Sequence, residues 1–152
     1  MPIRPYTTTD WAQLCAVHDL ARKGELAASG LLDAFLTLEQ TAENEGLFDG
    51  RVLVYESEGL VRGFVAFADQ ELTWLYVDPA CYRLGIGRKL LRHAIEACGG
   101  NISTEVLVGN DSALQLYLSE GFRILRRVDG KLTGNESFAA SGYVLQRSAG
   151  DA

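Results

Sequence analysis

The stretch YRLGIGRKLL, residues 82–91, places two closely spaced glycines among basic side chains and ahead of an apolar pair. It follows the apolar run ELTWLYV (71–77), which Asp78-Pro79 terminates, and it leads into apolar residues that recur at the 3.6-residue period of a helix. The order is therefore strand, glycine-rich turn and helix. Such a turn presents free backbone N–H groups at the positive end of the helix dipole, which favours the binding of a phosphate group.

Two common phosphate-binding motifs do not fit this stretch. A P-loop needs the string G-x-x-x-x-G-K-S/T, which the chain lacks, and the dinucleotide fingerprint needs a third glycine where Leu90 stands. The stretch also follows several strands instead of opening the first strand–helix–strand unit. The residues alone leave two alternatives open, namely a site for a pyrophosphate carried by another kind of ligand and a turn whose glycines only permit tight bending.

The rest of the chain alternates between strand and helix patterns, with Gly and Asp-rich turns between them. This alternation predicts one domain, residues 1–152, of the α/β (α+β) class with a mixed sheet. We expect strands at 3–6, 51–56, 60–67, 71–77, 104–108, 122–128 and 141–146, helices from 11 onward and at 30–45, 85–98 and 110–120, and a loop or wide hairpin end at 129–140.

Composition excludes several classes of partner. The net charge of −6 disfavours a nucleic-acid-binding protein, which needs a positive surface. No apolar run approaches the roughly 20 residues of a membrane span, and the first residues lack the apolar core of a signal peptide. We therefore expect a cytoplasmic protein without nucleic-acid or membrane partners. The three cysteines are scattered, with no C-x-x-C spacing, which predicts free thiols and no metal site.

Two motifs together resemble the GCN5-related N-acetyltransferases. Residues 75–91 resemble the family's pyrophosphate motif, which reads Gln or Arg, two variable residues, Gly, one variable residue and Gly or Ala. Residues 110–122 resemble its next motif, N-x-x-A-x-x-x-Y-x-x-x-G-F. The resemblance spans about the whole chain, since residues 3–11 are also similar to the family's first strand and helix start. The Gln or Arg position is Tyr82 here, and a glycine that the family places next is Arg83.

The resemblance implies a mixed, mostly antiparallel sheet of six to seven strands flanked by about four helices. It also implies a V-shaped split between the two central strands, 71–77 and 104–108. The implied activity is transfer of an acetyl group from acetyl-CoA to a primary amine of a small molecule or peptide, directly within a ternary complex and without a metal. A homodimer is compatible with the same analogy. The alternative is a non-catalytic acyl-CoA sensor, because Thr73 stands where the family often has a catalytic glutamate.

The resemblance also implies a role for individual residues. Backbone groups of Leu75 and Val77 would bind pantetheine, and a backbone N–H near Tyr76 would polarise the thioester. Asn110 would bind pantetheine, cap the helix that follows, or do both. Tyr117 would be the acid for the sulfur of CoA, and Glu71 the substitute for the missing base. The remaining cofactor-binding residues form the pyrophosphate loop: Arg83, Leu84, Gly85, Ile86, Gly87 and Arg88.

Overall fold

A computed structural model describes residues 2–151, and within them the strands form one seven-stranded sheet in the order β1-β2-β3-β4-β5-β7-β6. Adjacent strands are antiparallel except β4 and β5, which are parallel. The mixed, mostly antiparallel sheet predicted from the sequence is therefore confirmed. The strands are β1 (Ile3–Pro5), β2 (Arg51–Ser57), β3 (Leu60–Ala68), β4 (Glu71–Val77), β5 (Ile102–Leu107), β6 (Arg123–Leu132) and β7 (Asn135–Arg147).

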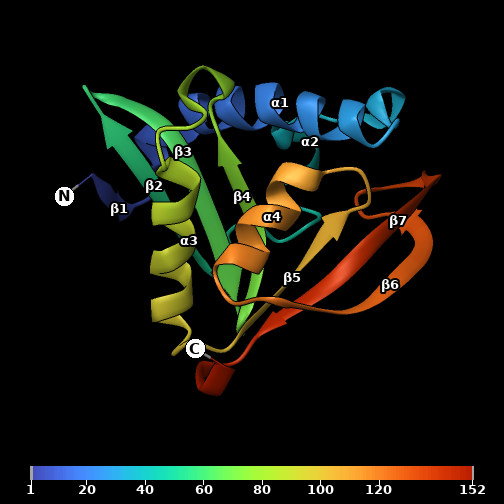
Figure 1. The fold of residues 1–152 in the computed structure, drawn as a ribbon. Coiled ribbons are helices and arrows are strands. Elements are labelled where there is room, and N and C mark those ends of the chain that lie inside the picture. Colours follow the sequence, from blue (N-terminus) through green and yellow to red (C-terminus); the bar gives the residue numbers. More distant parts are fainter. Residues whose placement is uncertain (1, 152) are drawn as a thin grey trace.

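Helices cover both faces of the sheet (Figure 1). Helix α1 (Trp11–Ala28) and the short α2 (Leu38–Thr41) pack on one face, where Leu14 and Leu38 are fully buried against Phe64 of β3. Helices α3 (Ile86–Ala97) and α4 (Asp111–Ser119) cover the other face. Within the part of the chain that the structure describes, no helix combines the length and apolar character of a membrane span.

The sheet is split between β4 and β5. Their parallel pairing has one register position, Glu71 opposite Ser103, and it is reinforced by a 2.9 Å bond from the Ser103 N–H to the Gln70 carbonyl. Thr104 adds a 3.1 Å bond from its Oγ1 to the carbonyl of Leu72. Beyond these residues the two strands diverge toward their carboxyl ends (Figure 1). The predicted V-shaped split is confirmed.

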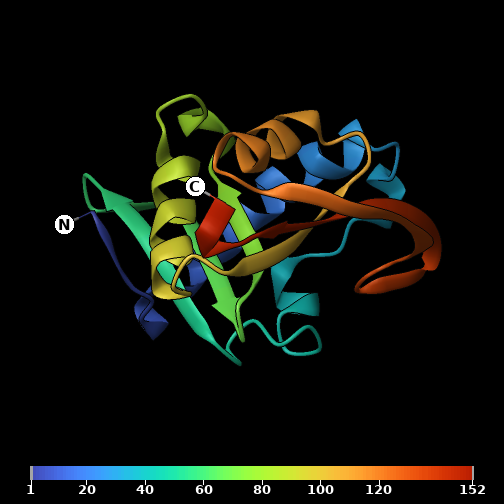
Figure 2. The same cartoon turned by 60° about the horizontal axis from the view of Figure 1, so that its bottom comes forward.

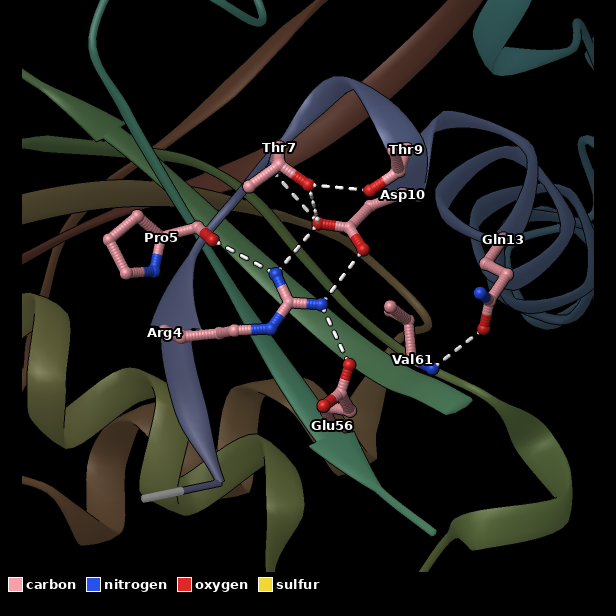
Figure 3. A network of polar contacts seen from close by, with 8 residues as sticks. All are labelled: Arg4, Pro5, Thr7, Thr9, Asp10, Gln13, Glu56 and Val61. Carbon is pink, nitrogen blue, oxygen red and sulfur yellow. Dashed lines mark hydrogen bonds and ion pairs between the residues drawn. The ribbon is translucent and has the colours of Figure 1, made fainter. Parts of the chain in front are cut away.

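An ion-pair network fixes the amino-terminal strand to the start of α1 (Figure 3). Arg4 donates two hydrogen bonds of 2.8 Å to the two carboxylate oxygens of Asp10 and a third, also 2.8 Å, to Glu56 of β2. Asp10 also accepts a 2.9 Å bond from the Thr7 N–H. The hydrogen bond from Arg4 is the main cause that lowers the pKa of Asp10 to about 2. Thr7 and Asp10 form a capping box at this helix start, and the ion pair with Arg4 holds the Asp10 side chain in it.

The predicted helix over residues 30–45 is wrong. The segment contains a 3-10 turn (Leu32–Ala34), an extended Phe35 with φ −60° and ψ 131°, and then α2. The apolar residues of this segment pack differently from a continuous helix, because Ala34 is buried with Leu26 of α1 and Leu132 of β6. Thr37 then starts α2, since its side chain accepts a 3.2 Å bond from the N–H of Gln40.

Of the two alternatives predicted for residues 129–140, the hairpin end is confirmed and the loop is wrong. Strands β6 and β7 continue through it as a long antiparallel ribbon, with Leu132 paired with Asn135 around the turn (Figure 2). The residues of β6 before Leu132 are exposed, so no alternating hydrophobic pattern indicates that the strand predicted over 122–128 continues to Leu132. Phe138 and Ala140 on β7 pack against the cluster around Leu26, which places the ribbon beside the split.

Candidate active site

Backbone N–H and C=O groups of Leu75 and Val77 are free on the edge of β4 that faces the split. The Asp78 N–H donates a 2.8 Å bond to the Arg62 carbonyl of the neighbouring strand segment. Backbone groups of a strand alternate in direction, so Tyr76 also bonds toward β3, while Leu75 and Val77 present their N–H and C=O groups to the open side. The structure therefore directs toward the split the two residues that the sequence assigned to pantetheine.

The loop before α3 has the geometry of an anion site. Arg83 and Gly85 have φ values of 70° and 80°, in the left-handed region, and Gly85 is the N-cap of α3. The first intrahelical bond runs from the Lys89 N–H to the Gly85 carbonyl, 3.1 Å, so the N–H groups of residues 86–88 have no intrahelical partner. A Cβ added to Gly85 would meet open space. These groups fit a pyrophosphate, with Leu84, which is 65% exposed, at the tip of the loop.

The Arg88 side chain has a structural partner. It donates to Ser119 Oγ at 2.9 Å and to the carboxylate of Glu120, which also accepts a 2.7 Å bond from Arg92 Nε. The hydrogen bond from Arg92 is the main cause that lowers the pKa of Glu120. These ion pairs tie α3 to the end of α4. Only the backbone N–H of Arg88 is therefore directed to the loop's anion site in this structure.

Tyr117 lies inside the core, on α4. It is 5% exposed, and its ring packs edge-on against Phe122 with 5.2 Å between centroids. Burial raises the pKa of the phenol well above its ordinary value, and a hydrogen bond with Thr104 opposes this only in part. The hydroxyl is therefore protonated at neutral pH and can donate a proton. Tyr117 also lines the cavity described next, so it can act on a group bound there.

A cavity of about 740 Å³ lies between the arms of the split, α1 and the β6–β7 ribbon. Glu71, the predicted base, lines its closed end, where β4 and β5 are still paired. Thr73 bulges out of the β4 ladder, and its Oγ1 donates a 3.2 Å bond to the Ala66 carbonyl. This bulge interrupts the alternation of faces along β4, so counting by two from Thr73 does not place Glu71.

Glu105 of β5 is a second carboxylate in the cavity, and sequence reasoning missed it. It is exposed, whereas its neighbours Thr104 and Val106 are buried toward the α3–α4 face. Glu105 therefore lies on the α1 face of the strand. A single acidic residue within the apolar run TEVLV is the signal that could have identified it.

Glu25 of α1 is the other missed residue, and it connects several predicted ones. Its Oε1 accepts a 3.0 Å hydrogen bond from the Tyr76 hydroxyl, and its Oε2 accepts a 3.2 Å bond from Asn110 Nδ2. Arg22 forms an ion pair with the same carboxylate. His18 packs edge-on against Tyr76, and burial lowers its pKa, which favours the neutral ring. Glu25 is 51 residues from Tyr76 and 85 residues from Asn110, so no local pattern indicates these two contacts.

Comparison with known proteins agrees with this geometry. Over 86 residues the chain is 41% identical to the N-alpha-acetyltransferase RimI of Mycobacterium tuberculosis, a match that covers 55% of this chain and 51% of that protein. The chain thus spans about half the length of this curated relative. The structure of a ribosomal-protein-alanine N-acetyltransferase from Brucella melitensis superposes with a TM-score of 0.73 at 26% identity, and 96% of this chain and 98% of that one are covered.

The fold recurs at lower identity as well. A GCN5-related N-acetyltransferase from Rhodopseudomonas palustris superposes with a TM-score of 0.79 at 16% identity, over 96% of this chain and 94% of that chain, which is a likeness of fold alone. A family model described as the acetyltransferase (GNAT) domain matches residues 48–124, from β2 through the first residues of β6. With half of its residues in that match, the chain belongs to the GNAT acetyltransferase family.

Proposed function

We propose that this chain transfers an acetyl group from acetyl-CoA to an amine, directly within a ternary complex. The observation that carries the proposal is the split between β4 and β5, with an anion site at the start of α3 and a cavity of about 740 Å³ on the other side. Acetyl-CoA supplies an activated thioester. The acceptor supplies the attacking amine, and residues of this chain would bind, orient and exchange protons with the two substrates.

Binding of the cofactor rests on backbone groups. The N–H groups of residues 86–88 would hold the pyrophosphate at the positive end of α3, together with those of the open loop from Arg83 to Gly85. Leu75 and Val77 would pair with pantetheine as an added strand would. One of their N–H groups, beside Tyr76, would polarise the thioester carbonyl, because both point away from β3.

Tyr117 would protonate the departing sulfur. Its phenol is protonated at neutral pH because burial raises its pKa, and its position in the cavity wall supports contact with the cofactor. The pKa of this phenol lies above that of a free thiol, so it would protonate a thiolate only where the thiolate is also removed from water. Removal from water disfavours the charged thiolate and makes it a stronger base. The buried surroundings of Tyr117 supply that condition.

Among the glutamates that line the cavity, two on the diverging strands are candidates to accept the proton of the amine. Glu71 was predicted from the sequence and lies where the strands are still paired, whereas Glu105 lies farther along the diverging arm of β5. The diverging arm of β5, which carries Glu105, borders the part of the cavity that is closest to the exposed edge of β4. We therefore favour Glu105 as the base and retain Glu71 as the alternative.

We further propose that the acceptor is the amino-terminal amine of a peptide or protein. The names of the relative from M. tuberculosis and of the B. melitensis structure support this choice. The cavity also suits a cation, since carboxylates of Glu45 and Glu136 line it beside the ribbon turn. Burial raises the pKa of Glu45 and the charge of Glu136 adds to this effect, whereas the charge of Arg22 opposes it.

The test combines binding and turnover. At a concentration one hundred times its dissociation constant, acetyl-CoA should stabilise the protein by roughly 2.7 kcal/mol, measured as a thermal shift. CoA release is then measured with a peptide that has a free amino terminus, the same peptide with a blocked terminus and an internal lysine, and small amines. The absence of any thermal shift would overturn the proposal. A shift without turnover on any amine would favour the acyl-CoA sensor instead.

A further inference from the structure

Glu25 spans the open end of the split. One of its carboxylate oxygens accepts from Tyr76 of β4, and the other accepts from Asn110, which stands between β5 and α4. The two arms that diverge at the split are thus joined again through one side chain of α1. We infer that Glu25 is a positioning residue that fixes the orientation of the Asn110 amide toward the cofactor, an inference that rests on the proposed function.

The side chain of Asn110 has no role in capping α4. The helix begins with a bond from the Leu114 N–H to the Asn110 carbonyl, 3.1 Å, and no capping hydrogen bond involves the Asn110 side chain. The backbone carbonyl of Asn110 alone therefore starts the helix. Its side chain remains available for the other role that the sequence analysis allowed, the binding of pantetheine. Within residues 2–151 the amide group has one hydrogen-bond partner, the carboxylate of Glu25.

A carboxylate partner determines which end of the amide faces it. Ionised Glu25 can only accept hydrogen bonds, so Asn110 must direct its Nδ2 group toward Glu25 and its Oδ1 away from it. Glu25 itself is held by Tyr76 and by the ion pair with Arg22, whose side chain is 19% exposed. The Oδ1 atom is thereby left as an acceptor. Pantetheine contains two amide N–H groups, and an oriented acceptor beside the split suits one of them.

Exchange of donor and acceptor between the two residues tests this directly. In Glu25→Gln, an NH₂ group can face the NH₂ group of Asn110, which turns the Asn110 amide and removes the acceptor. In Asn110→Asp, two carboxylates face each other. In the double variant the glutamine donates to the aspartate and still accepts from Tyr76, so an acceptor oxygen again faces the cofactor. Glu43→Gln, an exposed glutamate outside the cavity lining, is the matched control.

Calorimetric titration with acetyl-CoA gives the decisive numbers. Each single variant should bind about tenfold more weakly than the wild type, which corresponds to the loss of roughly one hydrogen bond between neutral groups. The double variant should recover to within about threefold of the wild type, and Glu43→Gln should match the wild type. The KM for acetyl-CoA should follow the same pattern, while the KM for the acceptor amine stays constant.

Two results would overturn the inference while leaving the proposed function intact. One is wild-type affinity in Glu25→Gln. The other is a double variant that is as weak as the product of the two single losses, since independent structural damage adds up in this way. A wild-type protein that fails to bind acetyl-CoA would instead overturn the proposed function, and the inference with it. Melting temperatures of all four variants separate these outcomes from unfolding.

Discussion

Replacement of Asp10 by Asn should destabilise the protein at neutral pH, and the size of the effect follows from the Arg4 network. The pKa of the Asp10 carboxyl falls from an ordinary 3.8 to about 2, a difference that corresponds to roughly 2.4 kcal/mol. The side chain of Asp10 is 5% exposed, but those of Arg4 and Glu56 are 31% and 40% exposed. Screening by solvent reduces the expected loss to about 1–2 kcal/mol.

The sign of the pH dependence is fixed by the direction of the pKa shift. Because the folded-state pKa of Asp10 lies below the unfolded-state value, the stabilisation is fully present above about pH 4 and is lost as the pH falls toward 2. Urea denaturation of the wild type and Asp10→Asn across this range should therefore give curves that converge at low pH. Equal stability at pH 7, or a gap that persists at pH 2, would refute this account of the network.

Three further variants test the site and the sheet. Tyr117→Phe should lower kcat about a hundredfold with an unchanged acetyl-CoA dissociation constant, because only the proton donor is lost; an unchanged kcat would remove this residue from the mechanism. Glu105→Gln should lower kcat/KM at pH 7 relative to the wild type. This difference should become smaller above the pKa of the acceptor amine, about 8, because the amine is then already neutral. The same pH dependence in Glu71→Gln instead would assign the role of the base to Glu71. Gly63→Ala should cost about 1–3 kcal/mol by urea denaturation, since its Cβ would lie 2.9 Å from a backbone carbonyl of β4; Gly130→Ala, with no atom within 4 Å of its Cβ, is the control.

The parts of the fold that could be predicted are those with local signals. The bounds of β4 agree with the prediction, because Asp69-Gln70 and Asp78-Pro79 interrupt the apolar run at both ends. The bounds of α3 agree with the prediction to within one residue at each end, because its buried face repeats at the helical period. The helix predicted over 30–45 failed because its apolar residues pack against the distant Leu132. A capping box at Thr37 was nevertheless present in the sequence and would have divided the segment correctly.

The candidate site divides in the same way. The loop from Arg83 to Gly87 and the edge of β4 are continuous in sequence, so a motif can reveal them. Glu25 depends on the fold that carries α1 over the ends of two strands, and no spacing in the chain encodes its contacts with Tyr76 and Asn110. Residues brought together by tertiary packing alone carry no periodic signal. This limit applies to any side chain that reaches a site from a separate helix.

The split has a mechanical consequence for the molecule. Past Thr104 no strand ladder of the described residues joins the two arms, and they are held by side chains. Val106 of β5 is buried in a cluster against which Leu75 and Val77 of β4 pack, and Glu25 bridges the arms on the other face. Backbone ladders fix strand separation at one value, whereas packed side chains can slide over each other by small amounts. A small change in the separation of the two arms would therefore break no hydrogen bond of the sheet. Because the sheet is interrupted at its centre, the free edge of β4 has no strand partner there. A bound cofactor would take that place and complete the hydrogen bonding of this edge.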